Sequence, residues 1–148
     1  MISAEWLRSA SFHEVWGAVI DPWLVASQQR DTFSAMTPAQ RDLIRAWLLH
    51  GVACRSGLGS LVTEEPPWIA EGMRDSLVRL GFATLAELWA EGTRGMEFAA
   101  WHGEIPAEVC FTSTRAIAAL QEELAAGTFA QLPELLVERL RVEPGICG

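Results

Sequence analysis

His50 and Cys54 have the residue types and the spacing of metal ligands. They stand four residues apart in a helical pattern, so both side chains can point to one side of a helix. Imidazole and thiolate groups are common ligands of zinc, but the chain has no HExxH sequence and no CxxC pair to supply further ligands. The sequence therefore favours a core cysteine beside a boundary histidine, with no metal and no cofactor. A metal site at His50 and Cys54 is the alternative.

Arg45 and His50 form a second pattern with chemical potential. The run Arg45-Ala46-Trp47-Leu48-Leu49-His50 resembles the R-x4-H pattern of the HEPN family of small helical ribonucleases. The resemblance implies that Arg45 and His50 act on RNA. A polar residue commonly follows the arginine in that family, whereas Ala46 follows it here. No other set of catalytic residues stands out, and we expect none in the leading interpretation.

The helix that must position these residues is predicted over about 38–55. Thr37 and Gln40 fit a capping box, and Pro38 suits the first helical position. A helix that is apolar nearly all round normally lies in the centre of a fold and is covered on several sides. The arc predicted to be most buried contains Leu43, Ile44, Trp47, Gly51 and Cys54, and Leu49 lies opposite it.

Amphipathic patterns along the rest of the chain predict about seven short helices packed around this central helix. The fold class is therefore all-α, with a single compact domain over 1–148, a mobile loop at about 56–67 and a frayed tail at 142–148. Local signals predict capping boxes at Ser11–Glu14 and Thr84–Glu87, a helix break at Asp21–Pro22, a connection over 30–36 and a left-handed terminator at Gly81. Further helices are predicted over 93–102, 114–126 and 133–141, and a run with strand propensity over 109–112.

The net charge of −8 is unevenly distributed along the chain. Residues 1–60 hold five acids and five arginines, whereas 64–108 hold nine acids and three arginines. This imbalance disfavours nucleic acid as a partner, because binding to a phosphate backbone depends on clustered cations. It favours a protein partner with a basic surface. The candidate partner-binding residues are Glu64, Glu65, Trp68, Glu71, Asp75, Glu87 and Glu91.

Two observations bear on where the protein acts. No apolar run approaches the roughly 18 residues of a membrane span, so we expect no membrane partner. The first residues lack the basic region and the unbroken apolar stretch of a signal peptide, so we expect a cytoplasmic protein.

The leading hypothesis is a non-catalytic helical protein that binds another protein through its acidic middle region. An immunity or antitoxin-type inhibitor, a secretion chaperone and an adaptor all fit this description. The alternative is a small enzyme or small-molecule-binding protein with a tryptophan-lined pocket near Arg45 and His50. The chain has seven tryptophans from which such a pocket could be built.

Overall fold

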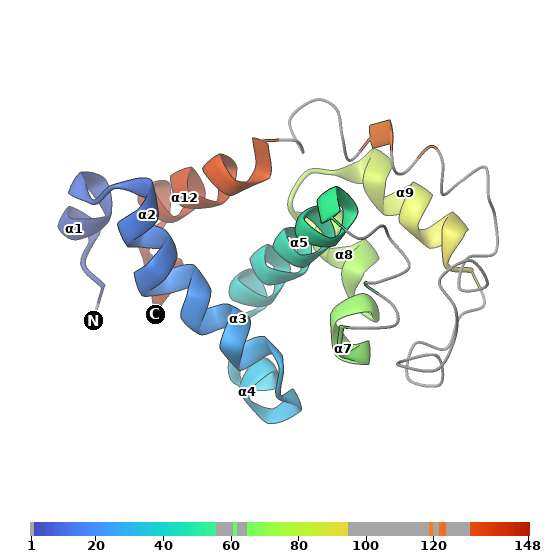
Figure 1. Cartoon of the computed structure of the whole chain (residues 1–148), viewed down its shortest axis with the longest axis horizontal. Coiled ribbons are helices and arrows are strands. Elements are labelled where there is room, and N and C mark those ends of the chain that lie inside the picture. Colours follow the sequence, from blue (N-terminus) through green and yellow to red (C-terminus); the bar gives the residue numbers. More distant parts are fainter. Residues whose placement is uncertain (1, 56–60, 62–64, 95–118, 120–121, 124–130) are drawn as a thin grey trace.

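The computed structural model describes residues 2–55, 61, 65–94, 119, 122–123 and 131–148, and the regular structure within these ranges is entirely helical (Figure 1). The all-α class expected from the sequence is confirmed. Most of the predicted helices over 93–102 and 114–126, the run at 109–112 and most of the loop at 56–67 lie outside the described residues.

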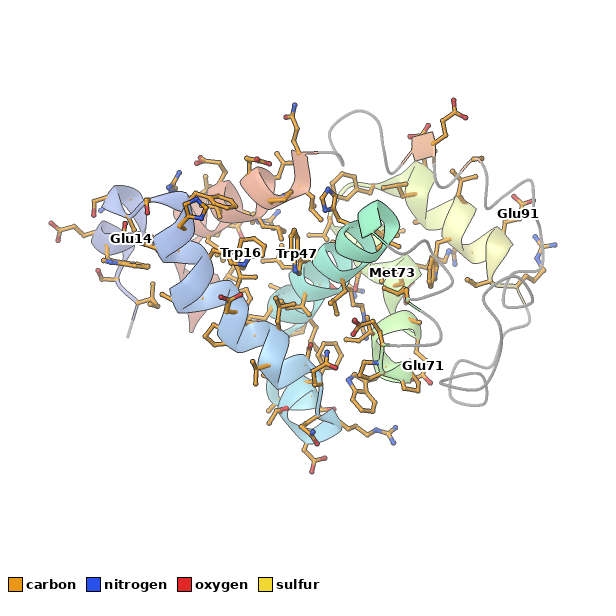
Figure 2. The ribbon with its side chains drawn as sticks, in the orientation of Figure 1. Glu14, Trp16, Trp47, Glu71, Met73 and Glu91 are labelled. Atoms are coloured by element: carbon orange, nitrogen blue, oxygen red, sulfur yellow. The ribbon has the colours of Figure 1, made fainter. Side chains whose placement is uncertain are left out.

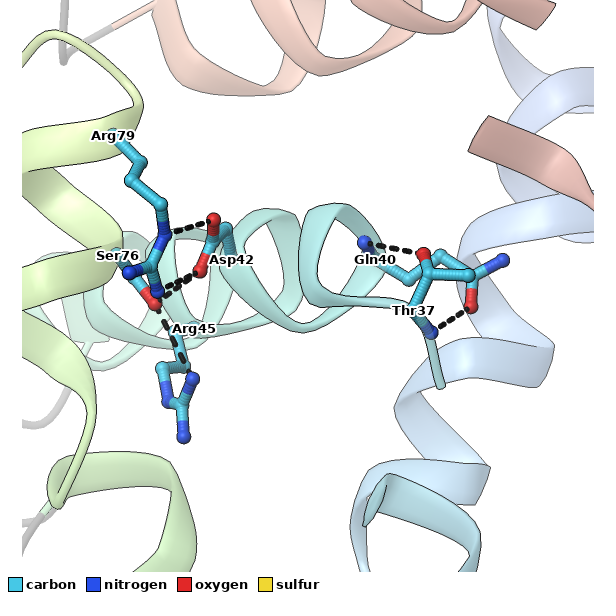
Figure 3. A network of polar contacts seen from close by, with 6 residues as sticks. All are labelled: Thr37, Gln40, Asp42, Arg45, Ser76 and Arg79. Carbon is cyan, nitrogen blue, oxygen red and sulfur yellow. Dashed lines mark hydrogen bonds and ion pairs between the residues drawn. The ribbon is translucent and has the colours of Figure 1, made fainter. Parts of the chain in front are cut away.

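Helix α5 (Pro38–Arg55) runs through the middle of the molecule in Figure 1. On the side where the N-terminal helices lie, it contacts α3 (Asp21–Ser27) and α12 (Leu132–Val142). On the other side it contacts α8 (Met73–Arg79). The predicted capping box at its start is present. The Thr37 amide donates to Gln40 Oε1 at 3.0 Å, and the Gln40 amide donates to Thr37 Oγ1 at 3.2 Å (Figure 3).

The buried side of α5 differs from the predicted arc. Leu43 and Ile44 are buried as expected, but Leu49 is fully buried and Trp47 is partly exposed. The prediction that Leu49 lies on the less buried side was therefore wrong. Helices pack against α5 from more than one direction, so a single buried arc does not describe it.

The N-terminal part is one nearly continuous helical run. After α1 (Ala4–Ser9), it comprises α2 (Phe12–Val15), the π-helix η1 (Trp16–Ile20) and α3. Its predicted capping box is confirmed, because the Ser11 amide donates to Glu14 Oε2 at 2.7 Å and the Glu14 amide donates to Ser11 Oγ at 3.3 Å.

The predicted break at Asp21–Pro22 was wrong. In a regular α-helix the ring of Pro22 would collide with the carbonyl of Ala18. The wider π turn in front of the proline changes this geometry, and the Asp21 amide bonds to the carbonyl of Trp16, five residues back. The chain therefore stays helical through the proline.

The expected connection over 30–36 is also helical. Helix α4 (Arg30–Ala35) places Phe33 in the core. Within it, the Thr32 hydroxyl donates to the carbonyls of Ala26 and Gln29, which precede the helix. So short a helix gives no recognisable sequence pattern. The burial of the Phe33 ring fixes its position instead.

Helices α7 (Pro67–Ala70), α8 and α9 (Ala83–Gly92) follow on the other side of α5. Gly81 terminates α8 as predicted, with φ of 88°. The Phe82 amide donates to the Leu77 carbonyl at 2.8 Å and the Gly81 amide to the Val78 carbonyl at 3.1 Å, which is the Schellman arrangement.

The capping box predicted at Thr84–Glu87 was wrong. Helix α9 begins two residues earlier than this box requires, at Ala83, and its N-cap is Phe82, which makes no side-chain cap hydrogen bond. The Schellman turn that ends α8 fixes where the next helix begins. The carboxylate of Glu87 is instead bound by Arg74 of α8.

The C-terminal residues, for which the sequence predicts fraying, are mostly helical in the structure. Helix α12 covers the predicted 133–141 and extends it by one residue at each end, and a 3₁₀ helix, η4 (Pro144–Cys147), follows. Ile146 is buried, and its carbonyl accepts a hydrogen bond from Gln40 Nε2 at 2.7 Å. This contact holds the tail against the start of α5. None of the described helices is both long and apolar enough to span a membrane.

Candidate protein-binding surface

Four of the candidate partner-binding residues lie exposed on α8, α9 and the residue after α7. They are Glu71, Asp75, Glu87 and Glu91, and together they are called the acidic surface below. In each of the pairs Glu71–Asp75 and Glu87–Glu91 the two residues are four apart. Figure 2 shows Glu71 and Glu91 on the outer side of these helices, away from α5.

A contact between α8 and α9 brings the two halves of the acidic surface together. Arg74 Nη2 lies 2.9 Å from Glu87 Oε1, and this pairing raises the pKa of Arg74. Because both side chains are exposed, the pair contributes little to stability. Glu71 and Asp75 form no ion pair with any other described residue. The surface therefore keeps a negative balance.

An apolar side chain lies within this charged region. Val78 is 51 % exposed on α8, four residues after Arg74 and three after Asp75, so it shares their side of the helix. The sequence pattern indicates this exposure, because Val78 falls outside the buried stripe that contains Met73 and Leu77. An exposed valine among carboxylates can make apolar contact with a partner that the charges attract.

Glu65 and Trp68 face a different element. Gln28 Nε2 donates to Glu65 Oε2 at 3.3 Å, and the indole Nε1 of Trp68 donates to the Ser27 carbonyl at 2.8 Å. Both contacts are with α3 or the residue after it, and Trp68 is partly buried. These two candidates therefore lie beside α3, and Glu64 lies outside the described residues.

A polar cluster on α5 and α8 holds the acidic surface in place (Figure 3). Arg79 donates to Asp42 twice, from Nε to Oδ2 and from Nη2 to Oδ1, both at 2.7 Å, and Ser76 Oγ donates to Asp42 Oδ1 at 2.6 Å. Burial raises the pKa of Asp42, but the hydrogen bonds from Arg79 and Ser76 and the charges of Arg79 and Arg45 outweigh it and lower that pKa. Asp42 is therefore a buried carboxylate that stays ionised.

Arg45 binds the next segment of the same side. Its Nε donates to the Ile69 carbonyl at 3.0 Å, its Nη2 to the Trp68 carbonyl at 2.9 Å and its Nη1 to Ser76 Oγ at 3.3 Å. The guanidinium carbon also lies 5.0 Å from the centre of the Phe33 ring. Burial lowers the pKa of Arg45, although an arginine stays protonated in proteins. All three guanidinium nitrogens are thus engaged within the fold.

His50 has different neighbours from Arg45. Its ring stacks on Trp47 at 5.7 Å between ring centres, and Trp47 in turn meets Trp16 edge to face at 4.4 Å. Figure 2 shows Trp16 and Trp47 directed toward each other between the N-terminal helices and α5. Five residues of α-helix separate Arg45 and His50 by about 140°, so the two side chains point to different sides of α5.

The tryptophan-lined pocket of the alternative hypothesis stays a prediction. Two hollows among the described residues, of about 420 and 230 Å³, are lined by neither Arg45, nor His50, nor any tryptophan. For the alternative metal site, the structure describes only the backbone of Cys54. No three histidine, cysteine or acidic side chains in the described ranges come close enough together to hold a metal ion.

Comparison with known proteins gives no relative. No protein-family model matches the chain, and neither a curated protein nor a solved structure matches it significantly.

Sequence reasoning missed the residues that fix the surface in space. Asp42 and Ser76 are buried polar residues, and Arg79 pairs with the first of them across 37 positions of sequence. The sequence offers one signal for this cluster, which is the position of the Asp42 carboxylate within an apolar helical pattern. A carboxylate there is stable only when a cation from another helix reaches it.

Proposed function

We propose that this is a non-catalytic protein-binding protein whose acidic surface, with Val78, recognises a basic partner. The observation that carries the proposal is the combination of exposed carboxylates on α8 and α9 with a buried polar cluster that fixes α8 to α5. Charges held on rigid helices need little ordering when a partner binds. An immunity or antitoxin-type inhibitor, a secretion chaperone and an adaptor are the functions that such a surface suits.

The expected binding mode follows from the position of the charges. Carboxylates at the rim of an interface act mainly on the rate of association, because they attract a positively charged partner before contact. This attraction weakens with salt, since the Debye length is about 10 Å at 0.1 M ionic strength. Val78, at the same surface, makes a short-range contact and acts on the dissociation rate.

The test begins with isolation of the partner from the source cell on the wild-type protein, followed by mass spectrometry. The interaction is then measured by stopped-flow kinetics over a salt series with the double variant Glu87→Arg/Glu91→Arg. The matched control is Glu5→Arg/Glu134→Arg, which makes the same change in net charge at exposed positions of α1 and α12.

We expect the α9 variant to associate at least about tenfold more slowly at low salt than wild type, and the control to differ little. Equal slowing in both variants would show that these acids act only through the overall charge of the protein. A flat salt response together with normal binding by the α9 variant would refute the proposed surface.

A further inference from the structure

A groove lies on another part of the molecule, between α5, the turn from α8 to α9, and α12. Its volume is about 420 Å³, within the range of roughly 300–1,000 Å³ that small-molecule sites occupy. Its walls are mostly apolar, and the apolar lining residues are Leu43, Leu80, Phe82, Leu132, Leu135, Leu136 and Val142. These come from three segments of the chain that are far apart in sequence.

A smaller hollow of about 230 Å³ lies next to the groove. The two share Leu43, Leu80 and Arg139 as lining residues, so they adjoin. The smaller hollow is more polar, because Asp42 and Arg79 also line it. The combined site thus has an apolar length and one end that carries two guanidinium groups.

Part of each guanidinium is available at this end. Arg79 uses Nε and Nη2 for Asp42, and the ion pair of Arg139 with Glu143 uses Nε at 3.1 Å. Nη1 of Arg79 and both Nη atoms of Arg139 make no hydrogen bond or ion pair with another described residue. Both side chains are also substantially exposed to solvent.

The carboxylates that line the groove are already paired with cations. Glu143 is paired with Arg139, and Glu138 with Arg141 Nη1 at 2.6 Å. Asp42 accepts hydrogen bonds from Arg79 and Ser76. Among the described residues, the donors without a partner therefore belong to the two arginines, and these N–H groups suit a carboxylate as acceptor.

We propose that this groove binds a small amphiphile with a carboxylate head and an apolar chain. The carboxylate lies between Arg79 and Arg139, and the chain lies along Leu80, Leu135 and Val142. Arginine offers paired N–H donors in the fixed geometry that suits a carboxylate. Burial of the chain against leucine side chains supplies the apolar contribution. The proposal is independent of the acidic surface, whose residues do not line the groove.

The test compares three probes with one chain and different head groups: decanoate, decan-1-ol and the decyltrimethylammonium ion. Binding to the full chain is measured by isothermal titration calorimetry below the concentrations at which the probes aggregate. We expect decanoate to bind at least about tenfold more tightly than either other probe, because charge-assisted hydrogen bonds to arginine are lost with the other heads. Equal affinity for all three, or tightest binding of the cation, would overturn the proposal.

Two variants with matched controls locate the site. Arg139→Gln should weaken decanoate binding about tenfold and leave decan-1-ol within about twofold, whereas Arg74→Gln, an exposed arginine in a similar ion pair outside the groove, should change neither. Val142→Glu places a carboxylate in the apolar wall and should weaken both probes. Val25→Glu is the control, because Val25 is 74 % exposed on α3 and Val142 is 75 % exposed.

A direct measurement keeps the proposal testable if a variant fails to fold. Methyl-labelled wild-type protein with decanoate should show nuclear Overhauser contacts from the chain to Leu135 and Val142. Contacts to methyl groups elsewhere, or decanoate binding that Val142→Glu leaves unchanged in a folded protein, would refute the site. The result does not depend on the acidic surface, so it can fail while the proposed function stands, and the reverse also holds.

Discussion

Arg79 of α8 donates two hydrogen bonds of 2.7 Å each to the carboxylate of Asp42 in α5. The two partners differ in their exposure, since the Asp42 side chain is 7 % exposed and the Arg79 side chain is 53 % exposed. The pair joins the central helix to α8, the helix that carries Asp75 of the acidic surface. It also forms one end of the amphiphile groove.

The difference in exposure predicts an unequal response to mutation. Arg79→Ala leaves a buried carboxylate with Ser76 as its remaining hydrogen-bond donor, so we expect a loss of about 2–4 kcal/mol in the free energy of unfolding. Asp42→Asn leaves a half-exposed guanidinium that water can solvate, so we expect a smaller loss of about 1–2 kcal/mol. Urea denaturation of both variants measures the order. A larger loss for Asp42→Asn would show that the arginine is the partner that depends on the pair.

The lowered pKa of Asp42 predicts a dependence of stability on pH. A carboxyl group with a lower pKa in the folded state stabilises the fold fully above its unfolded pKa, which is about 3.9, and this contribution is lost as the pH falls through the folded pKa. The free energy of unfolding of the wild type should therefore fall more steeply below about pH 4 than that of Asp42→Asn.

Glu14 adds a separate acid-sensitive contribution. Hydrogen bonds from the Ser11 backbone and side chain lower its pKa, so Glu14→Gln must be measured as the control. If Asp42→Asn and the wild type lost stability in parallel on acidification, the Asp42 carboxylate would not be the group that titrates.

Sequence reasoning succeeded where the physical cause is local. The capping boxes at Ser11 and Thr37 depend on residues three apart, and the Schellman turn at Gly81 depends on the backbone freedom of one glycine. The same kind of signal failed at Thr84, because the end of the preceding helix had already fixed where α9 begins. Local patterns therefore predicted the cap or terminator of a single helix well. They failed at a boundary that depends on two consecutive helices.

The missed features depend on residues far apart in the chain. The tail is bound to α5 by the hydrogen bond from Gln40 to Ile146, across 106 positions, and the groove needs α5, the turn after α8 and α12 together. The spacing of Arg45 from His50 suggests catalysis, whereas the bonds of Arg45 to the Trp68 and Ile69 carbonyls form only when α7 packs against α5. Periodicity along one helix carries no information about such partners.

The corrected core predicts which tryptophan matters most for stability. Trp89 is buried, whereas Trp47 is partly exposed and contacts Trp16 and His50. Trp89→Ala should cost about 3–5 kcal/mol, the range for large aromatic residues in a packed interior. Trp47→Ala should cost less than this, because Trp47 is only partly buried. Chemical denaturation checks the order, and a larger loss for Trp47 would indicate that its aromatic contacts outweigh its exposure.

Leu49 provides a second check on how α5 is oriented. Its side chain is fully buried, so Leu49→Ala should cost about 2–5 kcal/mol. Leu48 is partly buried and lies next to it in sequence, so Leu48→Ala is the matched control and should cost less. Equal losses in urea denaturation would mean that the two sides of α5 are buried to the same extent.

Gly72 is predicted to be intolerant of a side chain because of Arg45. A Cβ at this position would collide with the guanidinium carbon and the Nη2 of Arg45. That guanidinium cannot simply move aside, since it binds the carbonyls of Trp68 and Ile69 and the hydroxyl of Ser76. Gly72→Ala should therefore destabilise the protein by about 1.5–3 kcal/mol, the contribution of one hydrogen bond to a charged group. Gly17→Ala is the control, because a Cβ in this helical position meets no atom within 4 Å and should stabilise by up to about 1 kcal/mol.

A double-mutant cycle separates the collision from other effects at Gly72. If the guanidinium is the obstacle, Gly72→Ala should add almost nothing to the loss that Arg45→Ala causes alone, because the colliding atoms are then absent. The coupling between the two positions would be about as large as the single effect of Gly72→Ala. Additive losses would show that the alanine disturbs the start of α8 by itself, and that Arg45 does not control the spacing between α5 and the α7–α8 turn.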